Sequence, residues 1–165
     1  MISPEYSKLM ARYNRWQNRS LYTAAGRLTD ENRKLHQGAF FGSIHGTLNH
    51  LLWADHNWMH RFAGTPRPAI TGKDSPGMFA NWEDLERARA AFDETIIGWT
   101  DSLDQTWLDG EITWFSGAAG RDLTRPRWTI VTHFFNHQTH HRGQVHAMLT
   151  RLGAQTEDTD LMLMP

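Results

Sequence analysis

Apolar residues recur at spacings of three and four positions in four long segments of this sequence. The first segment shows the pattern with Leu9, Tyr13, Trp16, Ala24 and Leu28. Because an α-helix turns by ~100° per residue, this spacing places the apolar side chains along one face. Four amphipathic helices bury such faces against one another in a four-helix bundle. We therefore predict an all-α fold, an up-down four-helix bundle, in a single domain over residues 1–165.

Capping residues and helix breakers indicate where each helix begins and ends. The predicted helices span residues 3–28, 43–62, 82–103 and 126–152. Ser3, Ser43 and Asn81 are the predicted N-caps, because their side-chain oxygens can accept a hydrogen bond from a free backbone N–H. Gly153 is the residue type that commonly ends a helix in the left-handed conformation.

The segments between the predicted helices carry turn and strand signals. Residues 29–32 are predicted to form a break, and the Gly- and Pro-rich residues 64–78 a loop. Residues 107–128 contain a β-prone run at 112–116 followed by a turn-like Gly-Ala-Ala-Gly sequence. This pattern favours a short hairpin or an irregular excursion before the last helix. The apolar tail at 160–165 is expected to fold back on the bundle.

The charge balance and composition exclude several classes of protein. The chain has 17 Lys and Arg against 18 Asp and Glu, a formal net charge of −1, which argues against binding to nucleic-acid phosphates or anionic lipid. Arg142 and Arg151 are expected to be solvated, where they suit the helix dipole. There is no cysteine, so thiolate ligands and disulfides are excluded. Because no signal peptide or membrane span is recognisable, we expect a cytoplasmic protein without nucleic-acid or membrane partners.

Residues 133–146, HFFNHQTHHRGQVH, contain five of the ten histidines of the chain. Three-four spacing from Phe134 extends the apolar face of the last helix through His137 and His141. A buried imidazole without hydrogen-bond partners costs about 1–3 kcal/mol, whereas one divalent metal ion satisfies two imidazoles that lie one helical turn apart. Gln138 stands where helical zinc peptidases carry a catalytic glutamate, so the peptidase mechanism is not predicted.

The other histidines of this segment are separated by their angles around the helix. His133 also lies one turn from His137, so spacing alone allows a His133–His137 pair. The pair His137–His141 is preferred because His133 lies nearer the start of the helix. His146 lies ~180° from His137 and should face away, and His140 lies ~60° to one side.

A third ligand is expected from another helix, because two ligands hold an ion weakly. The second predicted helix carries His45 and His50 beyond opposite edges of its apolar face, and spacing does not choose between them. Three imidazoles leave coordination positions open, as in a catalytic zinc site. An ion of this kind lowers the pKa of bound water to about 7 and can equally hold a thiol as thiolate. The pattern therefore predicts either hydrolysis or thiol transfer.

Either reaction needs a group that handles protons near the ion. His140 and Asp55 can titrate and are the catalytic candidates. Asn49 and Gln144 can only orient or donate. For all four residues the alternative role is to orient the ligand imidazoles through hydrogen bonds.

Four stretches, taken together, are similar to a known family. They are YNRWQNRSL at 13–21, FFGSIHGTLNHLLWADHNWMHRF at 40–62, HFFNHQTHHRGQVHAMLTRLG at 133–153 and the C-terminal TDLMLMP. They resemble the DinB/YfiT-like superfamily of damage-inducible-type proteins. The resemblance spans nearly the whole chain and is least distinctive after residue 63 and at 107–128.

The resemblance implies a DinB-like four-helix bundle that binds zinc or nickel through one histidine of the second helix and two of the last. Carried to this chain, the implied ligands are His50, His137 and His141. It also implies a homodimer. Relatives resemble thiol transferases that use low-molecular-weight thiols, or metal-dependent hydrolases. We therefore expect a metal-dependent S-transferase or hydrolase that acts on a small molecule in stress or detoxification. The alternative is a non-catalytic metal-binding bundle that serves as a stress-response sensor or interaction protein.

Overall fold

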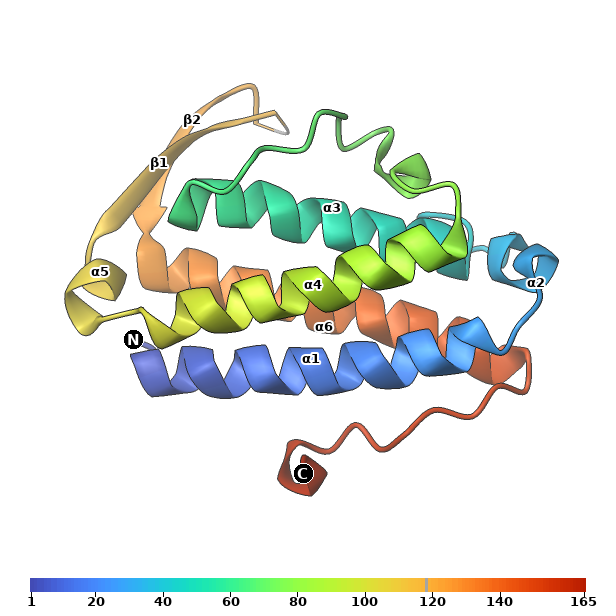
Figure 1. Cartoon of the computed structure of the whole chain (residues 1–165). Coiled ribbons are helices and arrows are strands. Elements are labelled where there is room, and N and C mark those ends of the chain that lie inside the picture. Colours follow the sequence, from blue (N-terminus) through green and yellow to red (C-terminus); the bar gives the residue numbers. More distant parts are fainter. Residues whose placement is uncertain (118) are drawn as a thin grey trace.

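Four long helices form the body of the molecule in the computed structural model, which describes residues 1–117 and 119–165 (Figure 1). The helices are α1 (Pro4–Gly26), α2 (Asp30–Lys34), α3 (Ile44–Ala63), α4 (Trp82–Asp101), α5 (Gln105–Asp109) and α6 (Arg127–Arg151). The other elements are the 3-10 helices η1 (Ser75–Gly77) and η2 (Leu161–Leu163) and the strands β1 (Glu111–Ser116) and β2 (Arg121–Pro126). The fold is thus mostly helical with a small two-stranded sheet. The predicted all-α class is therefore confirmed only in part.

The ends of the long helices follow the predicted signals with one exception. Ser3 and Ser43 each accept a hydrogen bond at Oγ from the backbone N–H three residues along the chain. Gly64 ends α3 with a φ of 68°, a conformation that costs glycine little. Asn81 lies at the start of α4, but its side chain bonds to Asp84 and caps no backbone N–H.

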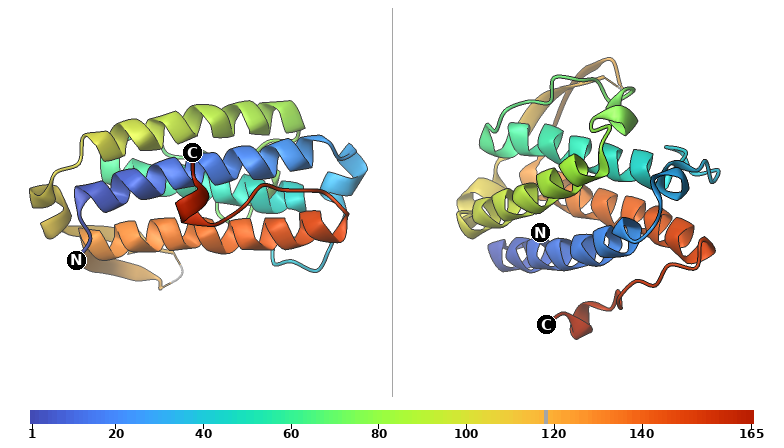
Figure 2. Two further views of the ribbon diagram at one scale, coloured as in Figure 1. Left: turned by 90° about the horizontal axis from the view of Figure 1, so that it is seen from below. Right: turned by 45° about the vertical axis from the view of Figure 1, so that its right-hand side comes forward.

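The directions of the helices differ from the predicted up-down arrangement. α1 and α6 run one way along the bundle, whereas α3 and α4 run the other way (Figure 1). Residues 64–81 lead back along the bundle, so α4 begins at the end where α3 also begins. α1 packs against both α4 and α6, and α3 packs against α6, as Figure 2 also shows. A short loop makes consecutive helices antiparallel, and this longer connection removes that constraint.

Aromatic side chains fill the core where α3 and α4 end and α6 begins. Phe62 stacks on Trp99 with ring centroids 5.1 Å apart, and Trp107 and Phe134 meet Phe62 edge-on. The remaining core is largely aliphatic, with fully buried side chains that include Ile44, Leu48, Leu52, Leu85 and Leu149. In the described part of the chain, none of the helices has the length and apolar character needed to cross a bilayer.

Two short helices were not predicted from the sequence. Residues 29–32 were predicted to form a break, but they contain the N-cap and the first turn of α2. Thr29 caps this helix, because its Oγ1 accepts a hydrogen bond from Asn32 N. Asp104 caps α5 in the same way through Trp107 N. Each helix has only five residues, too few to show an apolar period, so only the capping residue signals it.

The predicted hairpin before the last helix is confirmed. β1 and β2 pair antiparallel, with Thr113 opposite Thr124 and their hydroxyl oxygens 2.8 Å apart. Residue 118, in the predicted turn, lies outside the described residues. β2 leads directly into α6, and Arg127 N donates a hydrogen bond to Gly110 O.

The C-terminal tail folds back on the bundle only in part. Gln17 Nε2 donates to Asp158 O, Glu157 N donates to Ser20 Oγ and Tyr13 Oη donates to Thr159 O, so residues 157–159 lie along α1. The apolar end does not pack as expected, because Met162 is 87% exposed.

Candidate metal centre

Three histidines come together between α3 and α6. His50 on α3 and His137 and His141 on α6 each offer one ring nitrogen, and these atoms all lie within 4.8 Å of one another. The Nε2 atoms of His137 and His141 are 3.1 Å apart. Around a tetrahedral zinc ion, with Zn–N bonds of about 2.0–2.1 Å, ligand nitrogens lie roughly 3.3 Å apart. The His137–His141 pair therefore has the spacing of two ligands of one ion, with His50 close enough to be a third candidate, and these are the three histidines that the family resemblance implied.

Burial keeps these three imidazoles neutral at neutral pH. It lowers the pKa of His50 to about 4 and the pKa of His137 to about 3, and it also lowers the pKa of His141. The neighbouring rings lower the pKa of His50 and of His137 further, because a second positive charge nearby is unfavourable. Neutral imidazole is the form that binds a metal ion.

Aromatic rings surround His50. The ring of Phe41 stacks on His50 with centroids 3.7 Å apart, and it lies 5.4 Å from the ring of His141. Trp53 stacks near His50 at 5.9 Å. Gly42 follows Phe41 with a φ of 77°, which allows the tight turn that leads into α3. The aromatic rings shield one side of the centre from water and restrict the orientation of His50.

Ser75 orients His50 from the segment between α3 and α4. Its Oγ lies 2.9 Å from His50 Nδ1 and donates a hydrogen bond to Gly72 O at 2.7 Å. Because the hydroxyl hydrogen is directed at Gly72 O, the oxygen accepts from Nδ1–H of His50, which leaves Nε2 available to a metal ion. The sequence indicated only a loop here, and no signal in it pointed to His50.

Gln144 orients His141 from one turn further along α6. Its Oε1 lies 2.8 Å from His141 Nδ1, and its Nε2 lies 3.2 Å from His140 Nε2. With Gln144 as acceptor, His141 carries its proton on Nδ1 and directs Nε2 toward His137. The hydrogen bond from His141 to Gln144 therefore supports the predicted orienting role of Gln144. His140, which is exposed, lies beside the centre.

Two other candidates from α3 make contacts elsewhere. Asn49 Oδ1 accepts a hydrogen bond from Phe79 N and thereby holds the chain before α4. Asp55 lies in the core, where its Oδ2 is 2.6 Å from Arg89 Nη1, and Arg89 Nη2 is 2.8 Å from Asp93 Oδ1. Burial raises the pKa of Asp55 to about 6. The structure places Asp55 in a buried ion-pair cluster and outside the histidine group.

The remaining candidate histidines also lie outside this group. His45 Nε2 is 2.8 Å from Phe79 O. His133 is exposed, and its ring meets Trp58 edge-on. His146 lines a separate pocket against α1 and therefore faces away from the centre, as its angle predicted.

A groove of about 530 Å³ lies along α3 and reaches Trp53, and none of the three histidines is among the residues that line it. Trp53 lines it and donates from Nε1 to Ile70 O, so this one ring borders both the groove and His50. Arg61 and Arg67 also line the groove, and Phe115 of β1, 64% exposed, forms part of its rim. The groove offers room for a small molecule, and Trp53 is the residue that it shares with the surroundings of His50.

The sequence profile of the DinB family matches residues 1–165. The chain belongs to the DinB family. Among solved structures, this DinB-family chain is similar to YfiT from Bacillus subtilis, at 15% sequence identity and a TM-score of 0.68. The match covers 94% of this chain and 92% of YfiT, which is described as a probable metal-dependent hydrolase with an unusual four-helix bundle topology. A comparison with curated proteins found no match. The resemblance drawn from the sequence motifs is confirmed at the level of family and fold.

Proposed function

We propose that this DinB-family chain is a metal-dependent hydrolase whose divalent ion is held by His50, His137 and His141. The convergence of their ring nitrogens within 4.8 Å carries the proposal, and the description of YfiT supports it. Neutral imidazoles without thiolates suit zinc or nickel, and three protein ligands leave coordination positions open. When bound, such an ion polarises a carbonyl or phosphoryl group and makes water acidic enough to ionise near neutral pH.

Neighbouring residues of the chain orient the ligand imidazoles and transfer protons between the centre and solvent. Ser75 and Gln144 hold the Nδ1 atoms of His50 and His141, so that each Nε2 lone pair is directed into the centre. His140 is the titratable neighbour, with its ring 4.9 Å from that of His141. We assign it the transfer of protons between the centre and solvent. Its Nε2 accepts from Gln144 Nε2, so uptake of a proton there requires that this hydrogen bond breaks.

The groove that Trp53 shares with the surroundings of His50 supports a small, negatively charged substrate. Arg61 is half-buried, and burial together with the nearby charge of Arg67 lowers its pKa. Two cations that line one groove attract an anion and repel other cations. Trp53 and Phe115 supply apolar surface for the rest of such a molecule.

The test combines metal content with turnover on protein purified without a histidine tag. Elemental analysis should find one zinc or nickel per chain, and the loaded protein should hydrolyse activated half-esters of small dicarboxylic acids, which keep one negative charge. His141→Ala should lose both properties while circular dichroism shows the helices retained. His146→Ala, on the opposite side of the same helix, should keep both and is the matched control.

The other outcomes separate the alternatives. Turnover that requires an added low-molecular-weight thiol would replace hydrolysis by thiol transfer. A full complement of metal with no turnover would favour a non-catalytic metal-binding bundle. Absence of metal, with no uptake on titration into folded wild-type protein, would overturn the proposal. Homodimer formation, a role in stress or detoxification, and a cytoplasmic location stay predictions.

A further inference from the structure

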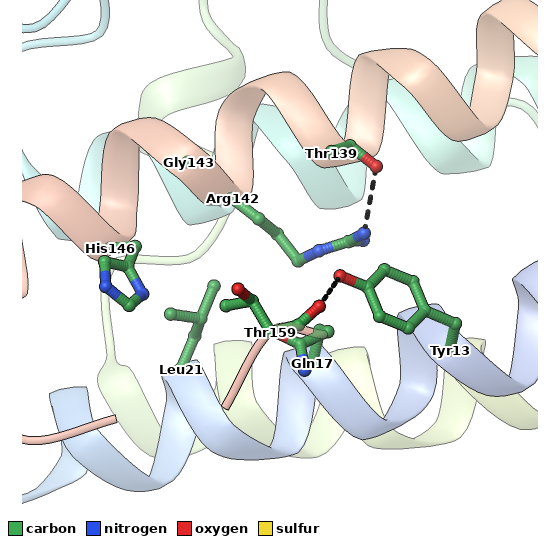
Figure 3. A pocket seen from close by; sticks show the side chains of 8 residues that line it. All are labelled: Tyr13, Gln17, Leu21, Thr139, Arg142, Gly143, His146 and Thr159. Carbon is green, nitrogen blue, oxygen red and sulfur yellow. Dashed lines mark hydrogen bonds between the residues drawn. The ribbon is translucent and has the colours of Figure 1, made fainter. Parts of the chain in front are cut away.

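A second pocket lies between α1 and α6, away from the histidine centre. Its volume is about 320 Å³, and Tyr13, Leu21, Arg142, His146 and Thr159 are among the residues that line it (Figure 3). Arg142 immediately follows His141 along α6, so it lies ~100° further around the helix. The pocket is therefore distinct from the candidate metal centre, although one helix borders both.

Arg142 reaches this pocket from a buried position, which differs from the solvated position expected from the sequence. Its side chain is only 5% exposed, and in Figure 3 its guanidinium extends from α6 toward Tyr13. Nη2 makes one long hydrogen bond, 3.3 Å to Thr139 Oγ1, and Nη1 has no hydrogen-bond partner. The only aromatic contact described for this cation is the Tyr13 ring, 5.6 Å from Cζ.

The positive charge of Arg142 lacks a paired acid. Among the described residues no carboxylate forms a salt bridge with it, because the nearest buried acids, Asp55 and Asp93, both pair with Arg89. Burial lowers the pKa of Arg142 to about 10, so the guanidinium stays charged at neutral pH. A buried cation without a partner is unfavourable, and one oxyanion offsets that cost through two parallel hydrogen bonds.

The C-terminal tail covers this pocket. Tyr13 Oη donates a hydrogen bond to Thr159 O at 2.6 Å, and Gln17 Nε2 donates to Asp158 O at 2.8 Å. Residues 156–159 carry no regular secondary structure, so these contacts with α1 hold the tail in place. A tail attached by individual hydrogen bonds can release and rebind, which gives a ligand a route in.

We propose that this pocket binds a small organic oxyanion, carboxylate or phosphate, whose charged end pairs with Arg142. The rest of the molecule would occupy the space beside Leu21 and His146 under Thr159 of the tail. The geometry favours a small molecule because 320 Å³ is near the lower end of ligand pockets, which span about 300–1,000 Å³. This inference is independent of the proposed hydrolase activity, because it uses none of the metal ligands.

The test measures the thermal unfolding midpoint of the full-length protein in sodium benzoate, in inorganic phosphate and in chloride, at matched ionic strength and pH. Benzoate or phosphate should raise the midpoint of the wild type, because a ligand that binds only the folded state stabilises it. A rise only in benzoate identifies a carboxylate ligand with an apolar body, and a rise only in phosphate identifies a phosphate group.

Two variants and one control make the test specific. Arg142→Met should abolish the rise, and in chloride it should unfold at the same or a higher temperature than the wild type, because an unpaired charge has been removed. Gly143→Leu should also abolish the rise while keeping Arg142, since a Cβ at this position meets no atom within 4 Å and the longer side chain can fill the pocket. Arg121→Met, which removes an exposed arginine of β2, should keep the rise.

The results that overturn the proposal are equally definite. If the oxyanions raised the unfolding midpoint equally in the wild type, Arg142→Met and Gly143→Leu, the anions would be binding non-specifically. The proposal would also be overturned if neither oxyanion raised the unfolding midpoint of the wild type and Arg142→Met were strongly destabilised in chloride. Arg142 would then only stabilise the packing of the bundle.

Discussion

At the scale of single residues, hydrogen bonds to Nδ1 decide which ring nitrogens remain for a metal ion. Ser75 binds Nδ1 of His50, and Gln144 binds Nδ1 of His141. A neutral imidazole has one protonated and one free nitrogen, so each bond sets the tautomer as well as the ring orientation. The proposed metal affinity therefore depends on residues that do not touch the ion.

Ser75→Ala should weaken metal binding by about 10- to 100-fold, because His50 loses the acceptor that holds its Nδ1–H. Competition with a chromophoric chelator measures the affinity, and Ser75→Thr, which keeps a hydroxyl, should restore part of it. Ser7→Ala is the matched control, because Ser7 is also 0% exposed and bonds only within the first turn of α1. Equal affinity in Ser75→Ala and wild type would contradict the orienting role.

At the scale of elements, the start of α3 connects the bundle with the candidate metal centre. A Cβ on Gly46, in the first turn of α3, would lie 2.5 Å from Phe41 O. That close approach lets the chain before α3 return over the helix and place the ring of Phe41 on His50. Glycine here is required by packing, because no other residue leaves that space.

Gly46→Ala should lower the free energy of unfolding by about 1–3 kcal/mol, since the backbone at Phe41 has to move. It should also weaken metal binding through the displaced ring. Gly98→Ala is the matched helical control: an added Cβ meets nothing within 4 Å, and Gly98 is exposed on α4. That substitution should raise the free energy of unfolding by about 0.5–1 kcal/mol. Urea unfolding compares the two, and destabilisation of equal size in both variants would refute the packing argument.

At the scale of the whole molecule, a buried ionic cluster joins three of the long helices. Arg89 of α4 pairs with Asp55 of α3 and with Asp93 of its own helix, and Asn18 of α1 donates to Asp93 Oδ1 at 2.9 Å. All four side chains are at least 96% buried. In such surroundings each charge requires its partner, so the cluster constrains how the helices register with one another.

Arg89→Met should lower the free energy of unfolding by about 3–5 kcal/mol, because two carboxylates are left in the core without a cation. Adding Asp55→Asn and Asp93→Asn to that variant should recover part of the loss. Arg15→Met is the control, because its ion pair with Glu94 lies at the surface and contributes at most about 1 kcal/mol. Chemical denaturation measures all variants, and a loss for Arg89→Met as small as that for Arg15→Met would refute the argument.

The sequence by itself determined the local features of this protein. Three-four periodicity and the caps at Ser3 and Ser43 predicted the long helices, because backbone geometry and capping act within a few residues. The one-turn spacing of His137 and His141 predicted their convergence for the same reason. Family motifs, and not spacing, indicated His50.

Only the tertiary structure decided the features that depend on distant contacts. The parallel course of α3 and α4 follows from the long return of residues 64–81, whose path no local signal specifies. Ser75 reaches His50, and Arg142 is buried beside α1 and the tail, because segments far apart in the sequence pack together. Periodicity describes one helix at a time, so the partners that each face meets are set by the packing of the whole chain.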